Sequence, residues 1–237
     1  MFENMAEALK IAIIGDFNFS YNSHHATNLA IEHSKSLLEI EVNYYWIRVH
    51  EAAEYKPDDF LNYDAVWLAP GPFENIFFMN GVTQTIIASQ LPVLITGDAF
   101  KVLVEVLVNQ FNINPKNEKK LISDNLAQEE QFEKIEVYPH SKQLKIMYNE
   151  MVRTELTATR FSIYPQLLNY LVKEVIDIEA YNQYEDPEII SLKHHPFCVA
   201  SMSIPQICST REMPHPLISS FLNFASQINQ ESDTKTG

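Results

Sequence analysis

Strand-like and helix-like segments alternate through the first hundred residues, and this order leaves few possible folds. Residues 10–15 (KIAIIG) form a β-branched apolar run closed by a glycine, and residues 23–38 carry apolar side chains at helical spacing. In residues 41–49 apolar and polar side chains then alternate, and aromatic side chains are frequent. Both features are typical of strands. Apolar runs at 63–69 and 91–96 predict two further strands and continue the alternation of strands and helices. Because parallel strands need crossover connections, we predict a doubly wound, mainly parallel α/β sheet with helices on both faces.

The second half of the chain loses this alternation. Residues 112–150 are rich in charge and contain alternating strand-like pieces at 133–138 and 144–148, which predict a small antiparallel excursion. The other predicted elements are strands at 188–193 and 197–203, and helices at 167–175 and 215–228. The sequence contains no internal repeat and no linker rich in Gly, Pro or Ser. We therefore expect one domain over residues 1–237, with its core at about 10–228 and a frayed tail at 229–237.

Composition and charge exclude several classes of partner. With 46% hydrophobic residues in a chain of 237, one substantial core can be buried. The formal net charge of −14 repels phosphate backbones and anionic membrane surfaces, so we expect neither nucleic acid nor membrane as a partner. No run approaches the roughly 20 apolar residues that span a bilayer. The opening MFENMAEALK is acidic where a signal peptide is basic, so the sequence indicates a cytoplasmic protein.

The cysteines and histidines give no sign of a metal site or cofactor. Cys198 and Cys208 are too few for a disulfide scaffold and lack the companions of a zinc site, so we expect two free thiols. The histidine groups have no acidic or cysteine ligand at a metal-like spacing. They are His24, His25 and His33, and His194, His195 and His215. Because two of them precede prolines (His195 and His215), we expect those two to have structural roles in turns.

Ligands of doubly wound sheets bind at the carboxyl ends of the strands, so the segments that follow the strands carry functional information. Three such segments stand out: residues 69–73 (APGPF), 94–100 (LITGDAF) and 195–217, which contains HPF, IPQ and HPL. Preceded by KIAIIGDF and its helix, they resemble in order the glutaminase domain of CTP synthase, a class I glutamine amidotransferase. That family has a PGG-F loop, an LG-C-LG-Q nucleophile turn and an HPF...Q-F-HPE...HPL ending. The resemblance spans residues 10–225 and implies a flavodoxin-like fold.

The resemblance also implies that the family's catalytic groups are missing. The chemistry needs a thiolate on a sharp strand-to-helix turn, a histidine base and a carboxylate that orients the histidine. The family's pattern places the cysteine position at Gly97, the histidine position at Ile204 and the glutamate position at Gln206. In the oxyanion loop, Pro72 replaces the second glycine and has no N–H to donate. Four departures together predict a chain that does not hydrolyse glutamine.

Some residues in or outside these segments keep the character of a ligand site. Arg160 matches an arginine that in the family helps to hold the substrate carboxylate, although an arginine on a surface strand is more often a solvated charge. Lys101 stands where the family has a glutamine and would make the pocket cationic. Asp98 is either a carboxylate nucleophile or, as we favour, a helix N-cap or dipole partner. The ligand-binding candidates are Gly71, Pro72, Phe73, Asp98, Lys101 and Arg160.

Three functional hypotheses remain open at this point. The leading one is a non-catalytic amidotransferase-like protein that binds a small metabolite, a protein partner or a second copy of itself. The second is an enzyme of altered chemistry on an unknown substrate, which uses Asp98, Lys101 or Arg160. The third is a chain that resembles CTP synthase but cannot perform its reaction, because no phosphate-binding loop is present and no room is left for a ligase domain. Ammonia release, alanine replacement of those three residues and conversion of UTP to CTP distinguish the hypotheses.

Overall fold

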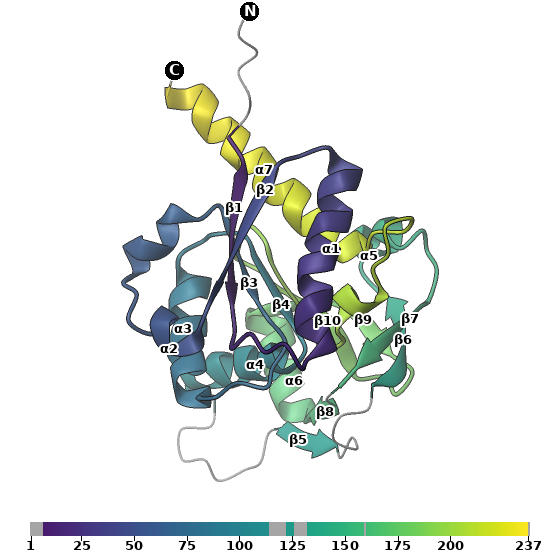
Figure 1. Ribbon diagram of the computed structural model, residues 1–237. Coiled ribbons are helices and arrows are strands. Elements are labelled where there is room, and N and C mark those ends of the chain that lie inside the picture. Colours follow the sequence, from purple (N-terminus) through teal and green to yellow (C-terminus); the bar gives the residue numbers. More distant parts are fainter. Residues whose placement is uncertain (1–6, 114–121, 126–131, 159, 237) are drawn as a thin grey trace, which may run out of the picture.

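The computed structural model describes residues 7–113, 122–125, 132–158 and 160–236 (Figure 1). Within them, one sheet has the strand order β2-β1-β3-β4-β11-β10-β9-β6-β7. Its parallel half consists of β1 (Leu9–Ile14), β2 (Val42–Ile47), β3 (Ala65–Leu68), β4 (Val93–Thr96) and β11 (Cys198–Ser201). In chain order these five strands have the 2-1-3-4-5 arrangement of flavodoxin-like sheets. The predicted doubly wound fold is therefore confirmed.

The antiparallel excursion continues the same sheet. Four strands extend it beyond β11: β10 (Pro187–Leu192), β9 (Ile176–Asn182), β6 (Glu133–Pro139) and β7 (Arg153–Thr157). A separate two-stranded sheet pairs β5 (Ile122–Asn125) with β8 (Arg160–Ile163).

Helices cover both faces of the parallel strands. One face packs against α1 (Asn22–Leu38) and α7 (Pro216–Thr236), and the other against α3 (Ile76–Ala88), α4 (Asp98–Gln110) and α6 (Pro165–Glu174). Alternate residues of β1 enter the two cores, with Ile11 and Ile13 on one side and Ala12 and Ile14 on the other. The short helices are α2 (Val49–Ala52), α5 (Lys142–Met147), η1 (Pro57–Asn62) and η2 (Pro205–Cys208). None of the helices in the described residues is long and apolar enough to span a membrane.

Two local predictions were wrong. The strand predicted at 144–148 is helix α5, because Ser141 caps it and its hydroxyl accepts the N–H of Leu144 at 3.1 Å. The buried residues there are Leu144 and Tyr148, spaced by one helical turn, whereas Ile146 between them is 68% exposed. Helix α7 continues to Thr236, beyond the predicted end at residue 228, so most of the tail expected to fray is helical.

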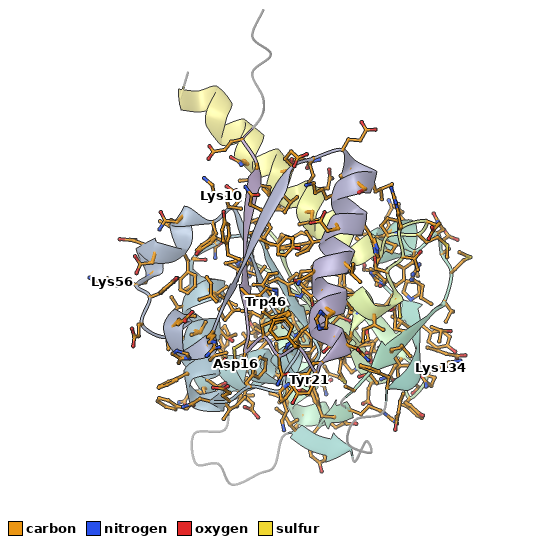
Figure 2. The ribbon with its side chains drawn as sticks, viewed as in Figure 1. Lys10, Asp16, Tyr21, Trp46, Lys56 and Lys134 are labelled. Atoms are coloured by element: carbon orange, nitrogen blue, oxygen red, sulfur yellow. The ribbon has the colours of Figure 1, made fainter. Side chains whose placement is uncertain are left out.

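The carboxyl ends of the parallel strands gather at one edge of the sheet. Figure 2 shows Lys10 near the start of β1 and Asp16 just beyond its end, at the edge where Tyr21 also lies. The loops after β1, β3 and β4 meet at this edge. The fold therefore brings the first two segments singled out by the sequence to the place where such sheets bind ligands.

Candidate functional site

The turn between β4 and α4 has the sharp geometry that the sequence predicts. Gly97 forms it with φ 63° and ψ −133°, a conformation that L side chains rarely adopt. The Gly97 N–H donates to the carbonyl oxygens of Ser201 at 3.0 Å and Ser203 at 3.2 Å. The chain at the end of β11 therefore holds the turn in place, and the backbone conformation favours glycine there.

Two apolar side chains occupy the space around Gly97. A Cβ atom built on Gly97 would lie 2.8 Å from Cβ of Pro70 and 3.5 Å from Cγ1 of Ile204. Both neighbours are buried. The structure thus brings Gly97 and Ile204 together, two of the positions that the resemblance assigns to the family's catalytic groups. Only hydrocarbon atoms make the contact, so it offers no group that transfers a proton.

Gln206 lies beside the same turn in η2 and is buried. Its Nε2 donates to the hydroxyls of Thr27 at 3.2 Å and Thr96 at 3.3 Å, and Thr96 immediately precedes Gly97. Its Oε1 has no hydrogen-bond partner in the described part of the chain. A neutral amide at this position ties α1 to β4 but cannot carry the negative charge that orients and stabilises a protonated histidine.

The loop after β3 packs against the start of α4. Gly71 and Asp98 are in contact, and a Cβ on Gly71 would approach Cβ of Asp98 to 2.9 Å, so only glycine fits there without displacing the Asp98 side chain. Pro72 is exposed and Phe73 is half-buried. The structure therefore unites four candidates, Gly71, Pro72, Phe73 and Asp98, beside Gly97.

Asp98 is not the helix N-cap that we favoured from the sequence. Gly97 occupies the N-cap position, and Asp98 is the first residue of α4, where a carboxylate is stabilised by the helix dipole. Lys101 follows one turn later and is half-buried.

Arg160 makes two contacts that the sequence did not predict. Its guanidinium carbon lies 4.1 Å from the ring centroid of Tyr184, and its Nη1 lies 3.5 Å from Oε2 of Glu133. Arg160 is half-buried, so it is not the fully solvated charge that surface arginines usually are. These contacts join β8 to β6 and to the β9–β10 turn.

His24 positions the loop that lies against Gly97. Its Nδ1 accepts the N–H of Asn18 at 3.0 Å, so the proton is on Nε2, which donates to the carbonyl oxygen of Pro70 at 3.2 Å. Burial lowers the pKa of His24, which favours this neutral form. The role is structural, and no three His, Cys, Asp or Glu side chains within the described ranges are grouped to hold a metal ion.

Asp16 ties together the loops that follow three neighbouring strands. Its two carboxylate oxygens accept the N–H groups of Val49 at 3.2 Å and Glu74 at 2.9 Å. A hollow of about 290 Å³ lies beside Asp16, which is labelled in Figure 2; its other lining residues are Val49, His50, Glu74, Asn75 and Phe78. The chain passes from β1 to β2 on one side and then to β3 on the other, so the hollow lies at a topological switch point of the sheet.

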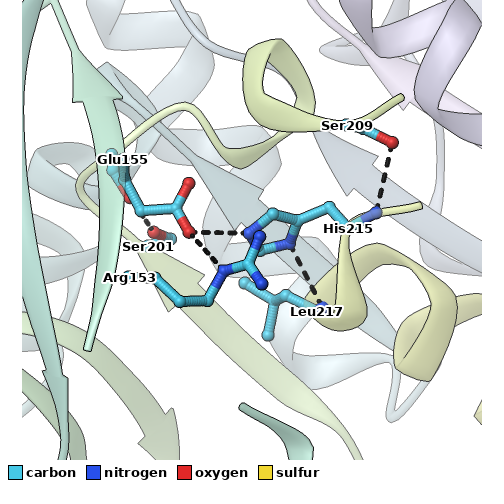
Figure 3. Close-up of polar contacts among 7 residues, drawn as sticks. Arg153, Glu155, Ser201, Ser209, His215 and Leu217 are labelled. Carbon is cyan, nitrogen blue, oxygen red and sulfur yellow. Dashed lines mark hydrogen bonds and ion pairs between the residues drawn. The ribbon is translucent and has the colours of Figure 1, made fainter. Parts of the chain in front are cut away.

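A buried acid–base pair lies away from the turn and was not predicted. Nε2 of His215 donates to Oε1 of Glu155 at 2.8 Å, and Nε of Arg153 lies 3.2 Å from the same oxygen (Figure 3). The N–H of Leu217 donates to Nδ1 of His215 at 3.2 Å, which places the imidazole proton on Nε2. Burial alone would raise the pKa of Glu155, but His215 and Arg153 together lower it below its ordinary value. His215 therefore does more than form the predicted turn.

Both cysteines are free, as predicted. Burial raises the pKa of the Cys198 thiol to about 12. Burial and the neighbouring Glu155 carboxylate raise the pKa of the Cys208 thiol to about 12 as well. Because the thiolate is the nucleophile, neither side chain is activated near neutral pH.

Glu188 is a second buried carboxyl group, on β10. Burial raises its pKa to about 7 and outweighs the hydrogen bonds from Asn182 and from the backbone at Ser203. Nδ2 of Asn182 donates to its Oε2 at 3.1 Å, while Oε1 has no partner among the described residues. Glu188 is therefore protonated at mildly acidic pH and charged at alkaline pH.

Glu188→Gln is expected to stabilise the protein at alkaline pH. The folded-state pKa is raised, so the stability that the protonated group provides is present below about pH 4.5 and is lost as pH rises through 7. A shift of about 2.5 units corresponds to about 3 kcal/mol at pH 9, which the uncharged amide avoids. Urea unfolding of both proteins at pH 5 and pH 9 measures this difference. If wild type and variant lost the same amount of stability between pH 5 and pH 9, this prediction would be wrong.

Comparison with known proteins identifies solved structures that have a similar fold. No protein-family model and no curated protein match the chain. Among solved structures, the glutaminase domain of Trypanosoma brucei CTPS, with bound acivicin, is similar with a TM-score of 0.76 and 17% identity, over 93% of this chain and 94% of that one. A Thermoplasma acidophilum protein assigned as a GMP synthase component has a TM-score of 0.61 and 14% identity, over 95% of this chain and 98% of that one.

A third similar structure has a different assignment. It is a ThuA-like protein from Bacteroides uniformis, with a TM-score of 0.56 and 8% identity over 95% of each chain. At these identities the likeness concerns the fold, and function must be argued from the site. The chain therefore has the class I glutamine amidotransferase fold, that of the glutaminase domain of CTP synthase.

Proposed function

We propose that this chain is a non-catalytic protein with an amidotransferase fold, which binds a small polar metabolite at the carboxyl edge of its parallel strands. The observation that carries the proposal is the packing at Gly97, where Pro70 and Ile204 fill the space that a nucleophile and its base would need. Acyl transfer by this fold requires a thiolate beside a histidine. The residues at these positions supply neither.

The remaining ionisable groups support the same proposal. The two thiols have pKa values raised to about 12. The buried imidazole of His215 already donates its Nε2 proton to Glu155. Asp98, the candidate for an altered chemistry, lies against Gly71 at the start of α4.

The hollow beside Asp16 is the proposed ligand site. Its volume of about 290 Å³ suits a molecule of the size of an amino acid, and carboxylate, imidazole and amide groups line it. We place the protein in the cytoplasm, where such metabolites are abundant.

Two measurements test the proposal. Purified protein is expected to release no ammonia from glutamine, and a thermal-shift screen over amino acids and nucleotides is expected to identify a compound that raises Tm. His50→Leu, which replaces a polar side chain that lines the hollow by an apolar one, should abolish that shift, whereas Ser36→Leu on the exposed face of α1 should not. Ammonia release that co-elutes with the protein and disappears in Asp98→Asn would instead establish an enzyme of altered chemistry.

A further inference from the structure

A groove on the helical surface, separate from the Gly97 turn, has the properties of a protein-binding site. It has a volume of about 550 Å³ and lies where α2, α3 and α4 meet, at the lower left in Figure 1. None of its lining residues is charged, although 20% of the chain is. Depletion of charge at the centre and enrichment in aromatic side chains distinguish interface cores from other surface.

Two phenylalanines on α3 are exposed at this groove. Phe77 is 77% exposed and Phe78 is 38% exposed, and both line it. Their ring centroids are 6.2 Å apart. Neighbouring large aromatic side chains in water are costly unless a partner covers them, and such residues dominate the binding energy of interfaces.

Gly81 leaves the floor of the groove open. It lies within α3 and lines the groove, and a Cβ atom built on it would meet nothing within 4 Å. Its φ is not in the left-handed region, so neither packing within the chain nor backbone conformation requires a glycine here. A glycine in a helix interior is unfavourable relative to alanine. Its absent side chain lets another backbone approach α3 closely.

An unpaired polar atom supports the same site. Oδ1 of Asn80 is buried and has no hydrogen-bond partner in the described part of the chain, and Asn80 lines the groove. A buried acceptor without a donor is unfavourable. Rotation of the Asn80 side chain toward the groove would expose this oxygen to a donor from a bound partner.

The charge around the groove indicates the chemistry of the partner. Ala52, Ala53 and Tyr55 line the groove, and the segment 51–59 that contains them carries four carboxylates, Glu51, Glu54, Asp58 and Asp59, against the single ammonium of Lys56; all five charged residues are exposed. The chain as a whole has a formal charge of −14. Two copies of this chain would repel one another, whereas a basic partner would be attracted.

We propose that the groove between α2, α3 and α4 is the docking site of a basic amphipathic helix from a partner protein. The apolar stripe of that helix covers Phe77 and crosses α3 at Gly81, and its lysines or arginines face the acidic segment 51–59. This is the helix-in-groove mode of recognition, in which apolar anchors at helical spacing enter a groove. The groove shares Phe78 with the hollow beside Asp16, but Gly81 lines the groove alone, so a substitution at Gly81 tests this proposal separately from the proposed function.

A fluorescein-labelled 18-residue Leu/Lys amphipathic peptide is the probe. Its binding is followed by fluorescence anisotropy against the full chain, a Gly81→Leu variant and an Ala88→Leu variant. Ala88 is also exposed on α3 but does not line the groove, so the two variants add the same side chain inside and outside it. Gly81→Leu is expected to weaken binding about tenfold and Ala88→Leu by less than about twofold. Because the added Cβ meets no atom, Gly81→Leu should also raise the urea midpoint of unfolding.

Three outcomes would overturn the proposal. Equal affinity of wild type and Gly81→Leu would show that the peptide binds elsewhere. Equal binding of a scrambled peptide of the same composition would show that net charge alone accounts for the interaction. A wild-type dimer in sedimentation that Gly81→Leu dissociates would make the occupant a second copy of this chain instead of a basic helix.

Discussion

A Gly97→Cys variant is expected to release no ammonia from glutamine and to lose about 2–6 kcal/mol of stability, as the sum of two costs. A side chain at φ 63° and ψ −133° costs roughly 1–3 kcal/mol of backbone strain. The approach of its Cβ to 2.8 Å from Pro70 forces overpacking that costs roughly 1–3 kcal/mol more. A thiol placed there still lacks a base, because Ile204 offers only hydrocarbon. Urea unfolding and a coupled ammonia assay measure the two effects.

Matched variants separate strain from the missing chemistry. Gly97→Ala carries the same Cβ without a thiol and should lose nearly as much stability as Gly97→Cys. Adding Pro70→Gly to Gly97→Cys removes the 2.8 Å contact and should recover part of the loss, again without ammonia release. Ammonia release by Gly97→Cys alone would contradict the packing argument behind the proposed function, since it would mean that the turn accepts a cysteine and that a base reaches it.

The parallel half of the fold could be predicted because each of its strands is a short apolar run with a helical segment beside it. Ile11 and Ile13 face one core and Ala12 and Ile14 the other, so a buried parallel strand reads as a continuous apolar run. β7 and β9 were not predicted, because their place in the sheet depends on pairing with β6 across intervening elements, in addition to the pairing of β9 with its neighbour β10. Local patterns carry little of that information.

The parts of the site that belong to a sequence motif could be predicted. The contacts that residues distant in the sequence make with them could not. The position of Gly97 at a sharp turn followed from the resemblance, whereas its contact with Ile204 was seen only in the structure. Pro70 lies in the APGPF loop, but the motif does not show that its side chain fills the space beside Gly97, and His24, which holds Pro70 in place, belongs to no motif. Their contact spans 46 residues and depends on how α1 packs over β3.

The Glu155–His215 pair illustrates the same limit. The two residues are 60 positions apart, and the sequence offered only the proline after His215, which indicates a turn. A glutamate in a strand is ordinarily placed on the exposed face. Its burial, at 1% exposure, becomes apparent only when α7 and β7 are seen together.

His215→Ala is expected to destabilise the protein by about 3–5 kcal/mol at neutral pH, because it leaves the Glu155 carboxylate buried without its hydrogen bond. Arg153, whose side chain is 28% exposed, compensates only in part. Urea unfolding at pH 7 measures the loss. A combined His215→Phe/Glu155→Leu variant, which removes the charge as well as its partner, should recover most of it, because apolar pairs often replace buried ion pairs without loss.

The pH dependence of the stability of His215→Ala distinguishes two reasons for its destabilisation, the loss of the hydrogen-bond partner of Glu155 and the loss of packed volume. In the wild type the pKa of Glu155 is lowered, so its contribution is present above the unfolded pKa and is lost as pH falls through the folded value. In His215→Ala the imidazole no longer opposes the effect of burial, so the pKa of the Glu155 carboxyl rises. As pH falls, protonation of Glu155 removes the buried charge and reduces the loss of stability. The two unfolding free energies should therefore converge between pH 7 and pH 4. A difference that stays constant over this range would mean that His215 acts only by filling space beside Tyr148, whose ring lies 6.0 Å from the imidazole.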